Sequence, residues 1–136
     1  MNVAAIALYT LEYDEWYASQ NAQPIYEEMA KLLILSLNRY MPGIDLIDIY
    51  RFKAKDWHSA SIKVLERLRT LNEQGNAVLR LDGDMLLVKP MPFPQEPYMH
   101  AYALAGCSFE CEGSSITFPI EKFLHGGLVY FPPNFP

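Results

Sequence analysis

Hydrophobic positions along the first part of the chain follow two alternating periods. Residues 3–9 form a continuous apolar run of strand length, which is typical of a strand covered on both faces. Between residues 24 and 38 the apolar positions recur at helical spacing, and Pro24 stands where a first-turn proline is tolerated. The Met-Pro-Gly sequence at 41–43 ends this helix, and a strand rich in β-branched residues is expected at 44–49.

The same alternation continues through a second helix and a third strand. Apolar residues repeat about every third position from Trp57 until Gly75, which is a natural helix end. Residues 77–81 form a short aliphatic strand, and an extended apolar run resumes at 85–88. Helices that alternate with continuous apolar strands predict an α/β fold with a mostly parallel central sheet flanked by helices.

The pattern changes after residue 88. The prolines within residues 89–97 predict an irregular connection without a helix, because each removes an amide donor and restricts the residue before it. Residues 98–104 and 115–118 are predicted to be short strands, and residues 126–131 a last strand entered through two glycines. The proline-rich tail at 132–136 cannot join a sheet interior.

Composition and charge narrow the class of protein. The 136-residue length and 51% hydrophobic content predict one domain, residues 1–136, with a substantial core. A net charge of -5 argues against a protein that holds nucleic acid by neutralising phosphates. No run approaches the roughly 20 apolar residues that cross a bilayer, and no basic segment precedes the first apolar run. Because the two cysteines are compatible with a reducing compartment, we expect a cytoplasmic protein without a membrane span.

Two carboxylates, Asp82 and Asp84, flank Gly83 where the third predicted strand ends. Ligands of open parallel sheets bind outside the carboxyl ends of the strands. Neighbouring carboxylates repel unless a cation lies beside them, and Mn²⁺ or Mg²⁺ combines one or two carboxylates with phosphate oxygens and water. The pair therefore predicts a Mn²⁺ or Mg²⁺ site for a diphosphate ligand, and Gly83 is expected to permit unusual backbone angles and a close approach by that ligand. The alternative is a solvated turn, since Asp and Gly are common turn residues.

At these residues the chain resembles the nucleotide-sugar glycosyltransferases of the GT-A fold, particularly family-8-like enzymes. Residues 81–84 match the Leu-Asp-X-Asp segment of that family, and apolar residues follow as they do there. Residues 123–129 are similar to its aromatic, Asn, small residue and Gly element before a strand, with His125 in place of the usual Asn. The end of the first strand looks like the family's nucleobase-contacting start, and residues 59–63 resemble the helix that presents a basic residue to the donor.

The resemblance implies a Rossmann-like fold of GT-A type and transfer of a sugar from a nucleoside diphosphate donor, with a UDP-sugar expected, to a hydroxyl acceptor. It implies that Asp84 binds the metal directly, that Asp82 contributes to metal and ribose binding, and that Lys63 faces the donor phosphates or sugar. The donor-binding residues that it implies come from four segments of the chain: Tyr9, Thr10, Lys63, Asp82, Gly83, Asp84, His125, Gly126 and Gly127.

Several hypotheses about the function of the chain remain open. The family's C-terminal part, which supplies a metal-binding His and a phosphate-binding Lys, has no counterpart before Pro136. The hypotheses are then a minimal or truncated enzyme, a donor-binding part completed by a partner or by a homo-oligomer, and an inactive interaction or structural subunit. A metal-dependent nucleotidyltransferase is a third class, which the lack of a glycine-rich basic loop near the first strand disfavours. No carboxylate spacing singles out a catalytic nucleophile.

Two weaker signals have a structural explanation that we favour. Two cysteines and two histidines could assemble a zinc site, but no second paired motif supports it and free thiols are expected: Cys107, Cys111, His100 and His125. Aromatic residues before the first helix could stack on a nucleobase, although packing against the core is the more common use of such residues: Tyr9, Tyr13, Trp16 and Tyr17.

Overall fold

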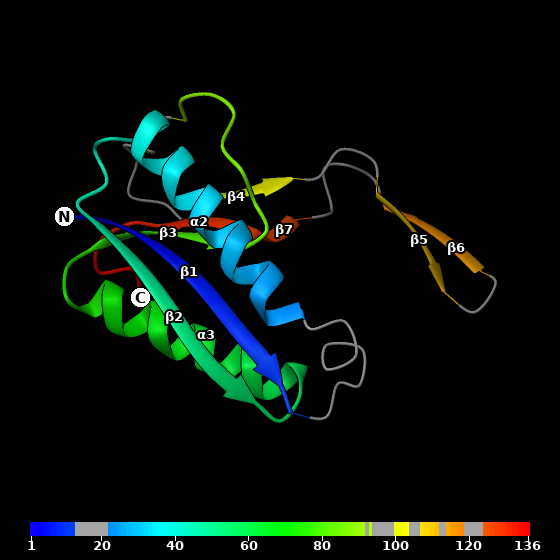
Figure 1. Ribbon diagram of the computed structural model, residues 1–136. Helices are drawn as coiled ribbons and strands as arrows, with labels where there is room; N and C mark the ends of the chain where they lie inside the picture. The colour runs from blue at the N-terminus through cyan, green and yellow to red at the C-terminus, as the bar shows by residue number, and fades with distance from the viewer. Residues whose placement is uncertain (13–21, 92, 94–99, 104–106, 112–113, 119–123) are drawn as a thin grey trace.

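The structure, a computed structural model, describes residues 1–12, 22–91, 93, 100–103, 107–111, 114–118 and 124–136, with the backbone alone for 22–23 and for those between 100 and 127 (Figure 1). Seven strands and two helices are present in these residues. In chain order they are β1 (Asn2–Leu11), α2 (Ala22–Tyr40), β2 (Leu46–Ala54), α3 (Trp57–Glu73), β3 (Ala77–Asp82), β4 (His100–Ala103), β5 (Cys107–Cys111), β6 (Ser114–Phe118) and β7 (Leu124–Phe131).

The main sheet has five strands in the order β2-β1-β3-β7-β4. Strand β1 pairs in parallel with both β2 and β3, whereas β7 runs antiparallel to its neighbours β3 and β4. Four of the five strands therefore point the same way, and β7 alone is reversed among them. Strands β5 and β6 form a separate antiparallel pair. The predicted α/β fold with a mostly parallel sheet is confirmed at this level.

The two helices cover opposite faces of the sheet (Figure 1). Successive strand residues point to opposite faces, so a strand covered on both sides is apolar throughout, as β1 is. One face of β1 and β3 packs on α2 in a cluster that includes Ala4, Ile6, Leu8, Leu33, Leu37, Leu79 and Leu81. The other face packs on α3 in a cluster that includes Val3, Ala5, Val64, Leu68, Leu71 and Val78.

Local signals define where each helix begins and ends. The Met41 amide donates to the Leu37 carbonyl at 2.7 Å as α2 ends before Pro42. A capping box begins α3, because the Asp56 carboxylate accepts from the Ser59 amide at 2.7 Å and the Ser59 hydroxyl accepts from the Asp56 amide at 3.1 Å. Gly75 adopts a φ of 84° just beyond the last turn of α3, a conformation that favours glycine. The predicted limits of this helix are confirmed.

Several predicted strand boundaries were wrong. Strand β2 begins at Leu46 and continues to Ala54, because it pairs with β1 along its whole length. Residues 85–88 belong to no strand, and β5 was not predicted. Strand β7 begins at Leu124 rather than at the glycines. Its pairing with β4 is irregular, because Ala101 pairs with Val129 whereas the next residue, Tyr102, pairs with His125, so that residues 126–128 lie between the two partners.

Candidate functional site

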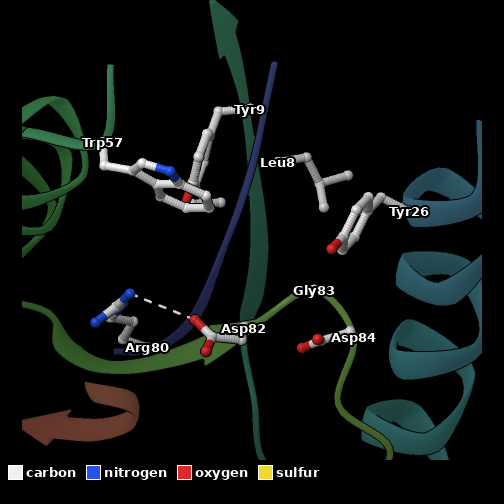
Figure 2. A pocket seen from close by; sticks show the side chains of 9 residues that line it. Leu8, Tyr9, Tyr26, Trp57, Arg80, Asp82, Gly83 and Asp84 are labelled. Atoms are coloured by element: carbon white, nitrogen blue, oxygen red, sulfur yellow. Dashed lines mark hydrogen bonds and ion pairs between the residues drawn. The ribbon is translucent and has the colours of Figure 1, made fainter. Parts of the chain in front are cut away.

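A cavity of about 260 Å³ opens at the carboxyl ends of β1 and β3 (Figure 2). Its walls come from both strands, from the turn after β3 and from the N-terminal parts of the two helices. The lining residues are Ala7, Leu8, Tyr9, Tyr26, Trp57, Arg80, Asp82, Gly83 and Asp84. This is the sheet edge at which open α/β folds bind ligands.

The predicted acidic segment, residues 82–84, forms a turn that is held by hydrogen bonds within the turn and just after it. The Met85 amide donates to the Asp82 carbonyl at 3.2 Å, which closes a four-residue turn. Beyond the turn, the Leu87 amide donates to the Ser36 hydroxyl of α2 at 3.1 Å. Turn geometry and a place in the cavity thus occur together, so the turn prediction and the ligand prediction do not exclude one another.

Gly83 is required here by packing rather than by its backbone angles. It is buried, its φ lies outside the left-handed region, and a Cβ built on it would lie 2.5 Å from Leu8 Cδ2. The close approach is therefore made by a core side chain of β1. The expectation that Gly83 serves an unusual backbone conformation was wrong.

The charged groups of the cavity interact directly. The Arg80 Nη2 atom donates to Asp82 Oδ1 at 3.3 Å, and the two side chains share one face of the sheet because they lie two positions apart on β3. Asp84 is exposed, and in Figure 2 its carboxylate is directed back toward Asp82. Burial raises the pKa of the Tyr9 hydroxyl, and the charge of Asp82 raises it further while Arg80 opposes the rise. Tyr9 thus stays protonated as a hydrogen-bond donor facing both charges.

Aromatic rings form the wall on the α3 side of β1. The Tyr9 ring stacks on Phe52 with centroids 5.4 Å apart and meets Trp57 edge-on at 5.7 Å. Trp57 is 54% exposed, so part of its indole surface is open to a ligand. Figure 2 shows Tyr9 and Trp57 on one side of the β1 backbone and Leu8 and Tyr26 on the other.

Two residues expected at the donor site lie elsewhere. Lys63 does not line the cavity, because its Nζ donates to the Lys53 carbonyl at 2.7 Å and lies over the Phe52 ring at the β2 edge. Thr10, which follows Tyr9 on β1, is also absent from the lining. The positive charge among the described lining residues comes from Arg80 instead.

The glycine-rich segment is placed by its backbone alone. Leu81 of β3 pairs with Leu128 of β7, and because the strands are antiparallel, Gly126 and Gly127 lie toward the end of the sheet where Asp82 is found. His125 of β7 pairs with Tyr102 of β4. The side chains of His125, Cys107, Cys111 and His100, which were weighed as zinc ligands and disfavoured, lie outside the described part, as do Tyr13, Trp16 and Tyr17.

Of the lining residues that sequence reasoning missed, three carry aromatic or charged side chains, and each of these three had a signal. Arg80 interrupts an otherwise aliphatic strand two positions before Asp82, a spacing that places both on one face. Trp57 directly follows the N-cap residue of α3, and helices that follow parallel strands begin at the ligand edge of the sheet. Tyr26 lies one turn into α2 for the same reason.

The donor set suits one mode of metal binding. Asp82 and Asp84 supply hard carboxylate oxygens, and Mg²⁺ or Mn²⁺ often takes only one or two carboxylates when phosphate and water complete its shell. In the part of the chain that the structure describes, no group of three or more His, Cys, Asp or Glu side chains could hold a metal by itself. Asp82 and Asp84 would therefore hold such an ion only together with oxygens from a ligand or from water.

Comparison of the chain with family models, with curated proteins and with solved structures gave no match in any of the three. Among the described residues, neither α2 nor α3 combines the length and apolar character that crossing a bilayer requires. The fold and the cavity define this chain as an α/β protein with an acidic, aromatic-walled cavity at the carboxyl edge of its sheet.

Proposed function

We propose that this protein is a metal-dependent glycosyltransferase that transfers a sugar from a nucleoside diphosphate donor, with a UDP-sugar as the expected donor, to a hydroxyl acceptor. The observation that carries the proposal is the cavity in which Asp82 and Asp84 lie beside the aromatic pair Tyr9 and Trp57. Oxygen ligands for a cation and flat surfaces for a base meet there at the carboxyl edge of a mostly parallel sheet.

The carboxylates and the aromatic rings of the cavity each have a part in binding the donor. Asp82 and Asp84 would hold Mn²⁺ or Mg²⁺ through their carboxylate oxygens. Trp57 offers exposed aromatic surface on which a nucleobase can stack, with Tyr9 edge-on beside it. The N-terminus of α3 lies at the same edge, since Trp57 is its first residue, but the Asp56 carboxylate already caps it, so it is given no part in binding the diphosphate.

The chemistry follows from the charge that the donor carries. A divalent cation bound at the carboxylates supplies charge neutralisation for the departing diphosphate. The Tyr9 hydroxyl keeps its proton because burial and Asp82 raise its pKa, so it donates rather than accepts toward phosphate oxygens. No side chain is given the part of nucleophile, because the described lining carboxylates are those that hold the cation.

Calorimetric titration with UDP and other nucleoside diphosphates, with and without Mn²⁺, tests the proposal. The wild-type chain is expected to bind at least one of them in a Mn²⁺-dependent manner. Asp82→Asn and Asp84→Asn should each weaken that binding about tenfold or more, because each removes a charged ligand of the cation. Asp45→Asn is the matched control, since Asp45 precedes β2 at the opposite edge of the sheet. The proposal is contradicted if Mn²⁺ increases the affinity for none of the nucleotides.

A second candidate function is donor binding without transfer, as in an interaction or structural subunit. It is favoured by the donor set, which stops at two carboxylates among the described residues. Release of UDP from UDP-sugars, measured with a broad panel of hydroxyl acceptors and with water alone, separates the two candidates. Turnover eliminates the binding-only function, and tight Mn²⁺-dependent binding without turnover supports it.

A further inference from the structure

Arg80 brings a positive charge into a cavity otherwise lined by acidic, aromatic and aliphatic side chains. It is the fourth residue of β3, whose other positions before Asp82 are all aliphatic and buried. Its neighbour on β1 is Ala5, which leaves room for the long side chain on the α3 face of the sheet. Its side chain is 29% exposed, so the guanidinium is partly desolvated yet open to the cavity.

We propose that Arg80 is a diphosphate-binding residue: its guanidinium, paired here with Asp82, binds a phosphate oxygen when a diphosphate enters the cavity. This inference rests on the proposed function for the presence of a diphosphate in the ligand. Arg80 would take the part that the sequence resemblance gave to Lys63, whose ammonium group is engaged with the Lys53 carbonyl outside the cavity. The proposed phosphate-binding cation therefore comes from strand β3 and not from helix α3.

The contact between Arg80 and Asp82 is weak enough to be exchanged. It is a single contact of 3.3 Å, at the long limit for a hydrogen bond. Arg51, in contrast, holds Glu27 through two nitrogens at 2.6 and 2.9 Å, and Arg67 holds Asp48 in the same two-pronged way. Bidentate pairs of that kind are strong and specific, whereas the Arg80–Asp82 contact joins one nitrogen to one oxygen, the weaker kind of contact that a phosphate oxygen could displace.

Because Arg80 is positively charged, its loss should affect the binding of a cation and of a diphosphate differently. The described lining residues carry one positive and two negative side chains, Arg80 against Asp82 and Asp84. The guanidinium repels a divalent cation at Asp82 and attracts a diphosphate. Loss of Arg80 should therefore weaken diphosphate binding while leaving the binding of Mn²⁺ alone unchanged or tighter. A purely structural part for Arg80 would weaken both.

The experiment compares Arg80→Met with wild type in the full chain. Calorimetry is used to titrate Mn²⁺ alone, then pyrophosphate and UDP in saturating Mn²⁺. Arg80→Met is expected to weaken pyrophosphate and UDP binding about tenfold or more, the size of a lost hydrogen bond between charged groups. Arg69→Met is the control, because it breaks an exposed guanidinium–carboxylate pair of α3 outside this cavity, and it should leave all three affinities unchanged.

The outcomes separate this inference from the proposed function. Wild-type affinity of Arg80→Met for pyrophosphate and UDP overturns the inference and leaves the function standing, and a parallel loss of Mn²⁺ binding overturns it as well. Absence of pyrophosphate binding by the wild type also overturns it. An Arg80-dependent pyrophosphate site in a chain that binds no nucleoside diphosphate supports the inference and removes the proposed function. If Arg80→Met does not fold, Arg80→Gln removes the same charge and is judged by the same criteria.

Discussion

Gly83 lies directly against Leu8, so closely that a Cβ at position 83 would stand 2.5 Å from Leu8 Cδ2. Leu8 belongs to the core cluster between the sheet and α2, where it is 8% exposed. The position of the acidic turn is therefore set by the core of the protein. Asp82 and Asp84 are presented from a rigid base, which a site for a metal and a diphosphate needs.

Gly83→Ala should destabilise the fold by about 1–3 kcal/mol, because the added methyl group must displace Leu8 in a packed core. Urea unfolding followed by tryptophan fluorescence measures the change. Gly43→Ala is the control, since a Cβ there meets nothing within 4 Å and φ lies outside the left-handed region, so stability should hold or rise slightly. Equal effects of the two substitutions would contradict the packing argument.

The Asp56 cap of α3 should make stability depend on acid. The hydrogen bonds from Ser59 hold the pKa of Asp56 below its ordinary value of 3.8, so its stabilisation is present above about that pH and is lost as the pH falls through the lower value in the folded state. Asp56→Asn keeps an acceptor that does not titrate. The stability of wild type relative to Asp56→Asn should fall as the pH is lowered from 5 to 2. A pH-independent difference would contradict this.

Two ion pairs should differ in their contribution to stability. Asp48 is 13% exposed and receives two hydrogen bonds from Arg67 of α3, so Asp48→Asn should cost about 1–3 kcal/mol by removing the negative charge that strengthens both hydrogen bonds. Glu27 pairs with Arg51 nearer to solvent, and Glu27→Gln should cost under about 1 kcal/mol. Urea unfolding at low and high salt checks both, and salt should reduce the Glu27 effect more.

Trp57 should contribute to recognition of the base and not of the phosphates. Trp57→Ala is expected to weaken UDP binding by about 1–3 kcal/mol, the range for stacking of a base on an aromatic ring, and to leave pyrophosphate binding unchanged. Ile62→Ala serves as the control, because Ile62 is an exposed apolar residue of the same helix outside the cavity. A similar loss for pyrophosphate and UDP would show that Trp57 acts through the position of α3 instead.

Much of the fold could be predicted because its signals are local. The apolar run of β1 and the helical spacing of α2 and α3 follow from residues adjacent in sequence, and the proline, glycine and N-cap signals mark the ends of the helices. The acids were expected at the carboxyl edge of the sheet for the same reason, since Asp82 and Asp84 immediately follow an aliphatic strand. The structure places both of them in a cavity there.

The sequence by itself thus determined the order of strands and helices as far as β3 and the place of the acidic turn at the end of that strand. Only the tertiary structure decided that β7 inserts antiparallel between β3 and β4, and that Arg80 rather than Lys63 enters the cavity with Tyr26 and Trp57. The reason is physical: periodicity records which side of an element is apolar, whereas the distant element that packs there is chosen by pairing and burial across the whole chain.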